Sequence, residues 1–185
     1  MALTPCSDLS PADWIVSSEL PWQRLVCFGP AGFAAYARLR FLPDPAFVGQ
    51  LEDNAEADSD QSDDNRLRLL FEVLATLTLT PQDCYFCRWD GYGDSYGPKV
   101  VVPNRAYFLF RGPLHQAGDR GTADPLDVPG PAFAWPADRA WCVARDVDPH
   151  WAGIGAERPV VDQLVADPRL DVVLADPSRQ QPAYR

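Results

Sequence analysis

The chain has 185 residues, of which 46% are hydrophobic and 23% charged, and its formal net charge is −10 at pH 7. This length and composition are typical of a single globular domain with a sizeable core, and no apolar run approaches the roughly 20 residues that cross a bilayer. An acidic surface repels a phosphate backbone and attracts a basic protein or a cationic ligand, which argues against nucleic acid as a partner.

The N-terminal part of the chain is predicted to hold one helix and two strands. Residues 1–14 lack the basic and apolar regions of a signal peptide, so we expect a cytoplasmic protein. A capping serine followed by proline predicts a short helix at about 11–19. The segments 24–29 and 34–42 read as strands on either side of the turn GPAG. Alternating apolar and polar residues favour a half-buried strand for the second segment, and a helix at 31–39 is the alternative.

The acidic stretch 51–65 contains no lysine or arginine and is predicted to be a solvated loop. It begins like a calcium loop at Asp58, but Asp63 and Leu69 stand where such a loop needs glycine and glutamate. A helix closed by Pro81 is predicted to follow, because apolar residues then recur at helical spacing: Leu67, Leu70, Phe71 and Leu74.

The remainder of the chain is predicted to consist mostly of strands. Aromatic and branched residues predict strands at 83–89, 99–102, 106–111, 140–147 and 170–175, and HWAGIG, which begins at His150, would extend the sheet. A long loop at 112–131, an amphipathic helix at 157–167 and a flexible tail from about 176 complete the chain. These elements predict an α+β fold in one domain, 1–185, with a mixed, mostly antiparallel sheet of about six or seven strands and three helices.

The five cysteines are expected to be reduced and mostly buried. Their odd number argues against a disulfide framework. Cys84 and Cys87 form a C-x-x-C, but side chains three residues apart on a strand point to opposite faces of the sheet. We therefore expect neither a disulfide between these two residues nor a redox or zinc site, and no cofactor is predicted.

The stretch CRWDGYGDSYGPK, residues 87–99, is the first candidate site. Three aromatic residues alternate there with two acids beyond a strand end, on backbone that glycine makes pliable: Trp89, Asp90, Tyr92, Asp94 and Tyr96. Amphipathic rings beside carboxylates suit recognition of a peptide, an arginine side chain or a sugar. The alternative is that the rings fold back and cover the end of the sheet.

A second candidate site is the cluster Asp146, Asp148 and His150. On an extended segment these three side chains face the same way, and two carboxylates with an imidazole are reasonable ligands for a divalent metal. An Asp–His pair could also perform general acid–base catalysis. Pro149 interrupts the segment, however, and the alternative is a set of solvated residues at a strand end.

Three blocks resemble a group of small uncharacterised proteins associated with actinobacteria. They are CYFCRWDGYG, VVVPNRAYFLF and WPADRAWCVARDVDPHWAGIGA followed by LVADPRLDVV, and they cover about the C-terminal 60% of the chain. The group implies no activity and no catalytic residues. The layout, a helix followed by a mixed sheet with a W-D-G-type turn, is also similar to that of immunity-type proteins that neutralise toxins, although their N-terminal motif is missing.

Two functions follow as hypotheses. The first is a non-catalytic cytoplasmic binding protein that engages a basic protein or cationic ligand through the acidic, aromatic stretch. The second is a small metal-dependent hydrolase that uses Asp146, Asp148 and His150. The glycine-rich stretch leads into another strand and not into a helix, and no serine lies in a G-x-S-x-G elbow, which argues against dinucleotide binding and against an α/β-hydrolase.

Overall fold

The structure, a computed structural model, describes residues 3–55, 62–93, 95–118 and 130–185. The strands in this part of the chain are β1 (Thr4–Pro5), β2 (Ala35–Arg40), β3 (Cys84–Trp89), β4 (Lys99–Val102), β5 (Arg105–Gly112), β6 (Phe133–Pro136), β7 (Trp141–Ala144), β8 (Trp151–Ala156) and β9 (Val172–Ala175). They form one sheet in the order β1-β5-β3-β6-β7-β8-β2-β9, and β4 pairs with the first half of β5. Every pair of neighbours is antiparallel.

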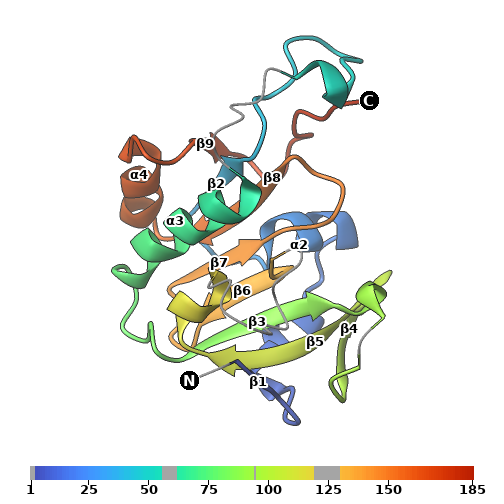
Figure 1. Ribbon diagram of the computed structural model, residues 1–185, viewed down its shortest axis with the longest axis vertical. Coiled ribbons are helices and arrows are strands. Elements are labelled where there is room, and N and C mark those ends of the chain that lie inside the picture. The colour runs from blue at the N-terminus through green and yellow to red at the C-terminus, as the bar shows by residue number, and fades with distance from the viewer. Residues whose placement is uncertain (1–2, 56–61, 94, 119–129) are drawn as a thin grey trace.

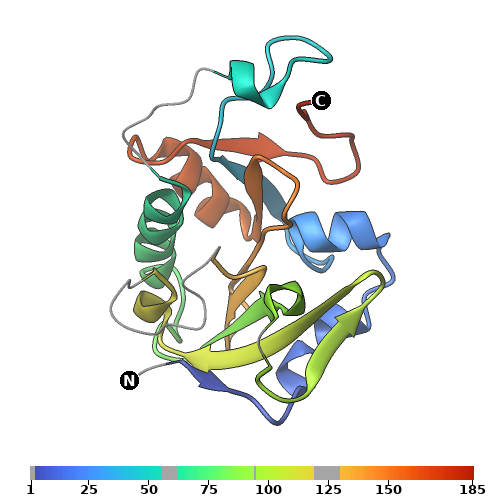
Figure 2. The same cartoon turned by 45° about the vertical axis from the view of Figure 1, so that its right-hand side comes forward.

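Helices cover both faces of this sheet (Figures 1 and 2). The helices α3 (Asp63–Ala75) and α4 (Arg158–Ala166) lie on one face, and α1 (Asp13–Val16) and α2 (Trp22–Phe28) lie on the other. Short 3-10 turns occur at Ser10–Ala12, Glu52–Asn54, Asp90–Tyr92 and Leu114–Gly118. No helix among the described residues is long and apolar enough to cross a membrane.

The core is therefore divided by the sheet into two clusters. Leu70 and Leu74 of α3 and Leu164 of α4 pack on one face, whereas Ile15 of α1 and Leu25 of α2 pack on the other. Every residue of β7 and β8 is buried as a result. Strands covered on both faces read as continuous apolar runs instead of alternating ones, which is the pattern of the sequence WCVA and WAGIGA.

The predicted α+β class and the antiparallel sheet are confirmed, but the predicted counts were too low. The described residues contain nine strands and four α-helices, against about six or seven strands and three helices expected. The missed β6 follows a stretch rich in glycine and proline, and the missed β1 has only two residues. Neither length nor composition distinguishes such elements from loops.

The prediction of a strand at 24–29 was wrong, because this segment is helix α2. Pro21 sets the backbone just before the helix, and Gly29, with φ +76°, ends it by donating its N–H to the Leu25 carbonyl at 2.8 Å. Leu25, Val26 and Phe28 are buried, while Gln23 remains exposed. A run of six mostly apolar residues fits a buried strand and a buried helix equally well, so the pattern alone could not decide.

The helix predicted after the acidic stretch is confirmed as α3. The Ser62 hydroxyl caps it by accepting a hydrogen bond from the Asn65 N–H at 3.3 Å, and Asp63 lies in the first turn, where negative charge is favourable. The helix ends at Ala75 and does not continue to Pro81. The expected loop at 51–65 lies partly outside the described residues, since 56–61 are not among them.

Glycine in β8 allows α2 to approach the sheet closely. A Cβ on Gly153 would lie 2.0 Å from the carbonyl oxygen of Cys27, which is far inside contact distance. Only a residue without a side chain permits this packing. Cys27 and Phe28, which meet β8 at this point, also border the larger of the two pockets described below.

The cysteines behave as expected: all five are free, and Cys84 and Cys87 lie on opposite faces of β3, in different core clusters. Burial raises the pKa of Cys84 to about 12 and raises that of Cys87 well above its ordinary value. Both thiols therefore remain protonated at neutral pH and are poor nucleophiles.

Thiol titration of the denatured protein without reductant is expected to count five free thiols. The reason is geometric, since a strand holds Cys84 and Cys87 on opposite sides of the sheet. A count of three would show that one disulfide forms and would contradict this arrangement.

Candidate functional site

A pocket with a volume of about 540 Å³ is here called the α2 pocket. Three parts of the fold border it: helix α2, the connection from β7 to β8, and the C-terminal segment 177–185. Glu52 adds a fourth side. The pocket therefore brings together segments that lie far apart in the sequence.

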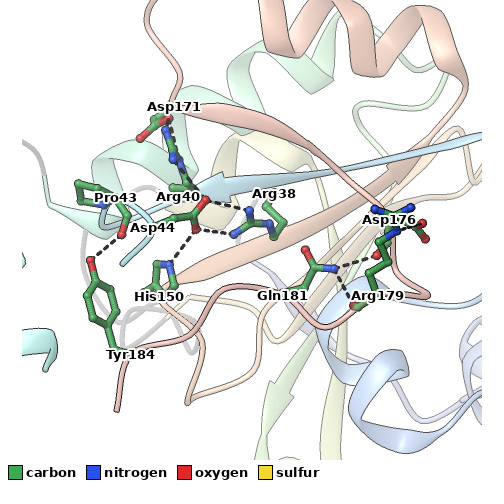
Figure 3. A network of polar contacts seen from close by, with 10 residues as sticks. All are labelled: Arg38, Arg40, Pro43, Asp44, His150, Asp171, Asp176, Arg179, Gln181 and Tyr184. Carbon is green, nitrogen blue, oxygen red and sulfur yellow. Dashed lines mark hydrogen bonds and ion pairs between the residues drawn. The ribbon is translucent and has the colours of Figure 1, made fainter. Parts of the chain in front are cut away.

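A partly buried ion network lies beside this pocket (Figure 3). Arg38 of β2, only 5% exposed, donates two hydrogen bonds to the Asp44 carboxylate, at 2.7 and 3.0 Å. The same carboxylate contacts His150 Nε2 at 3.2 Å and Arg40 at 3.4 Å. Arg40 also pairs with Asp171 at 2.7 Å. Asp44 thus joins β2, which carries both arginines, to the connection that borders the pocket.

Burial and hydrogen bonding shift the pKa of both acid–base groups in this network downward. Burial alone would raise the pKa of Asp44, but hydrogen bonds from Arg38 and His150 and the charges of Arg38 and Arg40 outweigh it and lower the pKa to about 2. Burial lowers the pKa of His150 despite the neighbouring carboxylate. The folded protein therefore holds an ionised Asp44 against a largely neutral His150 at pH 7.

The C-terminal segment is fastened beside the network (Figure 3). Tyr184 donates a hydrogen bond to the Pro43 carbonyl at 2.6 Å, and its ring meets the His150 ring edge-on with centroids 4.8 Å apart. The N–H of Arg185 donates to the Gln50 carbonyl at 2.9 Å. Gln181 donates to the carbonyls of Asp176 and Arg179. The flexibility expected of the chain from about 176 stays a prediction.

The lining of the α2 pocket includes two aromatic rings, only 3% and 5% exposed, and two carboxylates. The rings of Phe28 and Trp151 pack against each other with centroids 5.0 Å apart. Glu52 and Asp148 form no ion pair or hydrogen bond through their carboxylates with other described residues. Cys27 is not a nucleophile here, because burial and then the charges of Asp146 and Asp148 raise its pKa to about 12.

Stability is expected to fall as the pH is lowered from 7 to 5, because of His150. The ordinary histidine pKa is 6.5 and the folded value is lower, so below pH 6.5 the unfolded chain takes up a proton that the folded chain resists. In a comparison of melting temperatures at pH 7 and pH 5, His150→Gln should lose less stability than the unmodified protein. His115→Gln, at an exposed position, is the control. Equal pH dependence with and without His150 would contradict this.

A second, smaller pocket of about 200 Å³ is bordered by Trp89, Tyr92, Tyr107, Arg145, Asp146 and Val147, and is here called the Tyr92 pocket. Gly130 and Ala132 complete it. The Asp146 carboxylate accepts two hydrogen bonds from Arg105, at 3.0 Å each. Residues of both sequence-predicted sites therefore meet here, but the one carboxylate in the pocket's lining already has a partner.

The stretch 87–99 folds back on the sheet to a large extent. The Trp89 ring lies on Gly91, where an added Cβ would be 2.5 Å away, and it meets Tyr92 edge-on at 5.4 Å. Asp90 pairs with Lys99 at 2.9 Å. Tyr96 packs edge-on against Phe108 and Phe110 of β5, at 5.4 and 5.0 Å. Asp94 lies outside the described residues.

Tyr92→Ala is expected to lower the melting temperature by less than about 8 °C, because its half-buried ring borders a pocket and lies outside the two core clusters. Trp89→Ala should lower the free energy of unfolding by about 3 kcal/mol, since its ring packs against the core cluster on the side of α1 and α2. Thermal unfolding of both variants checks this. A collapse of the fold in both would show that the stretch is only a structural turn.

The second predicted cluster is divided between the two pockets. β7 ends at Ala144, and the connection to β8 bends instead of staying extended. Asp148 and His150 border the α2 pocket, whereas Asp146 borders the Tyr92 pocket. Within the described part of the chain, no three His, Cys, Asp or Glu side chains are grouped as metal ligands would be.

Sequence reasoning missed the residues that organise the α2 pocket, above all Arg38 and Asp44. One signal was present, because Arg38 and Arg40 share the polar face of a strand that turned out to be covered. Two arginines on a covered face need a carboxylate nearby, and Asp44 is the first acid after them. The α2 residues could not be found in this way while their segment was read as a strand.

Comparisons with family models, curated proteins and solved structures found no significant match to this chain.

Proposed function

We propose that this is a non-catalytic cytoplasmic binding protein whose α2 pocket takes a cationic group carried on a flat apolar body. Such a group is either a small organic cation or a basic side chain of a partner protein. The observation that carries the proposal is that one pocket contains both aromatic rings and two carboxylates, Glu52 and Asp148, that have no hydrogen-bond or ion-pair partner among the described residues.

The size and construction of the pocket support a ligand. Its volume of about 540 Å³ lies within the range of small-molecule sites, which are mostly apolar with a few placed polar groups. The network of Arg38, Asp44 and His150 holds one side in position by hydrogen bonds. A site whose walls are already ordered loses less entropy when a ligand binds.

The overall charge of the protein favours a cation. Of the three arginines that border the pocket, Arg179 pairs with Asp176. Arg24 and Arg185 then face two acids, Glu52 and Asp148, so the charged side chains of the lining balance. The net charge of −10 adds a long-range attraction for positive ligands. Aromatic rings provide a favourable surface for such a charge.

The state of the pocket's reactive groups supports a binding role over a catalytic one. Cys27 is protonated, with a pKa of about 12. His150 is 8% exposed and is held between Asp44 and the ring of Tyr184. A general base needs a free path to the proton that it removes, which this packing restricts.

The proposal is tested by calorimetric titration at pH 7 with benzamidinium, a flat aromatic cation. We expect binding with a dissociation constant of about 1 mM or tighter, and at least about tenfold weaker binding to Asp148→Asn. Benzyl alcohol, of similar shape but uncharged, should bind much more weakly than benzamidinium. Asp162→Asn removes an exposed carboxylate on α4 and should change nothing. Equal binding of both compounds, or no loss in Asp148→Asn, would contradict the proposal.

A basic partner protein would use the same pocket by inserting an arginine or lysine side chain. In that case Asp148→Asn should weaken the complex while Asp162→Asn leaves it unchanged. The resemblance to small actinobacterial proteins and the similarity in layout to immunity-type proteins stay hypotheses. The second would make the partner a toxin.

A further inference from the structure

We propose that the Tyr92 pocket is a second binding site, specific for the carboxylate of a small aromatic acid. It is independent of the cation site proposed above, because it lies on different residues and selects the opposite charge. Its lining includes Trp89, Tyr92 and Arg145.

The guanidinium of Arg145 has a hydrogen-bonding group to spare. Its Nη2 donates to Asp63 at 2.9 Å, and the guanidinium lies over the Phe41 ring at 4.5 Å. Its Nη1 is buried and has no hydrogen-bond partner among the described residues. A buried charged donor without an acceptor is costly, and a carboxylate or phosphate oxygen is the acceptor that best relieves that cost.

The other charged group in the lining does not compete for this donor. Asp146 is bound by two hydrogen bonds from Arg105, with the side chain of Asp146 only 10% exposed. The lining of the pocket therefore includes a partly exposed cation, Arg145, one of whose nitrogens is unpartnered among the described residues, and an anion with its partner in place. This arrangement repels a second cation and leaves an anion as the complementary ligand.

The walls select an aromatic body for that anion. Trp89 and Tyr92 meet edge-on at 5.4 Å, and Ala132 and Val147 add apolar surface. Arg145 and Arg88 both act on the Tyr92 hydroxyl, whose pKa is nevertheless raised, chiefly by burial. The hydroxyl therefore stays protonated and can donate to a carboxylate. A volume of about 200 Å³ suits a single ring with one acid group.

The test uses benzoate as the probe, with benzyl alcohol as its uncharged counterpart. Ligand-detected NMR and calorimetry at pH 7 should give at least about tenfold tighter binding of benzoate than of benzyl alcohol to this pocket. The indole N–H signal of Trp89, identified by its loss in Trp89→Phe, should shift on addition of benzoate. Equal affinities for the two compounds, or an unshifted Trp89 signal, would overturn the proposal.

Three variants separate the site from general stability. Arg145→Gln should lose at least about tenfold in benzoate affinity. Asp63→Asn breaks only the other ion pair of Arg145 and should keep binding. Val147→Trp, at a position 51% exposed on the rim, should block the pocket without disturbing the core.

If Arg145→Gln fails to fold, the result for Val147→Trp decides. Benzoate binding that is retained in Val147→Trp would overturn the proposal. Benzamidinium binding should persist in Val147→Trp, so failure of one site is distinguishable from failure of the other.

Discussion

Asp44→Asn is expected to lower the free energy of unfolding by about 3–5 kcal/mol, because it removes the charge that neutralises a buried arginine. Arg38 is 5% exposed, and both of its terminal nitrogens donate to Asp44. Burying a guanidinium costs free energy unless a carboxylate faces it. In Asp44→Asn, Arg38 stays buried and charged without that carboxylate, and this destabilises the folded state. His150 and Arg40 lose a partner at the same time.

Asp171→Asn is the matched control for that variant. Asp171 pairs with Arg40 at 2.7 Å, but its side chain is 35% exposed, and such pairs contribute about 1 kcal/mol or less. Urea unfolding of both variants measures the difference. If Asp44→Asn were no more destabilising than Asp171→Asn, this would contradict the role of the network in holding one side of the α2 pocket in position.

Gly153→Ala is expected to destabilise the protein by about 3 kcal/mol and to displace α2. The new Cβ would lie 2.0 Å from the Cys27 carbonyl oxygen and 2.9 Å from the Phe28 ring. A backbone atom in a helix cannot move aside alone, so the helix must shift away from β8. Because Cys27 and Phe28 border the α2 pocket, benzamidinium should also bind more weakly.

Gly155→Ala, two residues further along β8, is the comparison. Its Cβ would meet the ring of Phe33 at 2.4 Å, and a half-buried side chain in a loop can rotate out of the way. We expect a smaller loss of stability and little change in ligand binding. Equal effects of the two substitutions in thermal unfolding would show that the approach of α2 to the sheet is not the constraint.

Much of the fold could be predicted from periodicity and turn residues. Strands such as 99–102 and 106–111 were found because β-branched and aromatic residues cluster on either side of Pro103 and Asn104, and Asn104 indeed adopts φ +64° in that turn.

The helix α2 was missed for a physical reason. Its apolar face is buried against the sheet and its length is only seven residues, so no period could be read from it.

The candidate sites were predicted less well, because their geometry depends on contacts between distant segments. The pocket residues Asp148 and His150 were singled out, but for a metal cluster with Asp146 that the bent connection does not assemble. The partner of His150 is Asp44, which lies 106 residues away in the sequence. No spacing rule links such residues, whereas the pairing of β2 with β8 does.

The most direct test of the proposed function is to map where benzamidinium binds, by following backbone amide signals in two-dimensional NMR during a titration. The predicted result is a cluster of shifted signals at Gln23, Cys27, His150 and Tyr184, which border the α2 pocket from three separate segments. Shifts confined to other parts of the surface, or no shifts at millimolar concentrations, would contradict the assignment of this pocket as the cation-binding site.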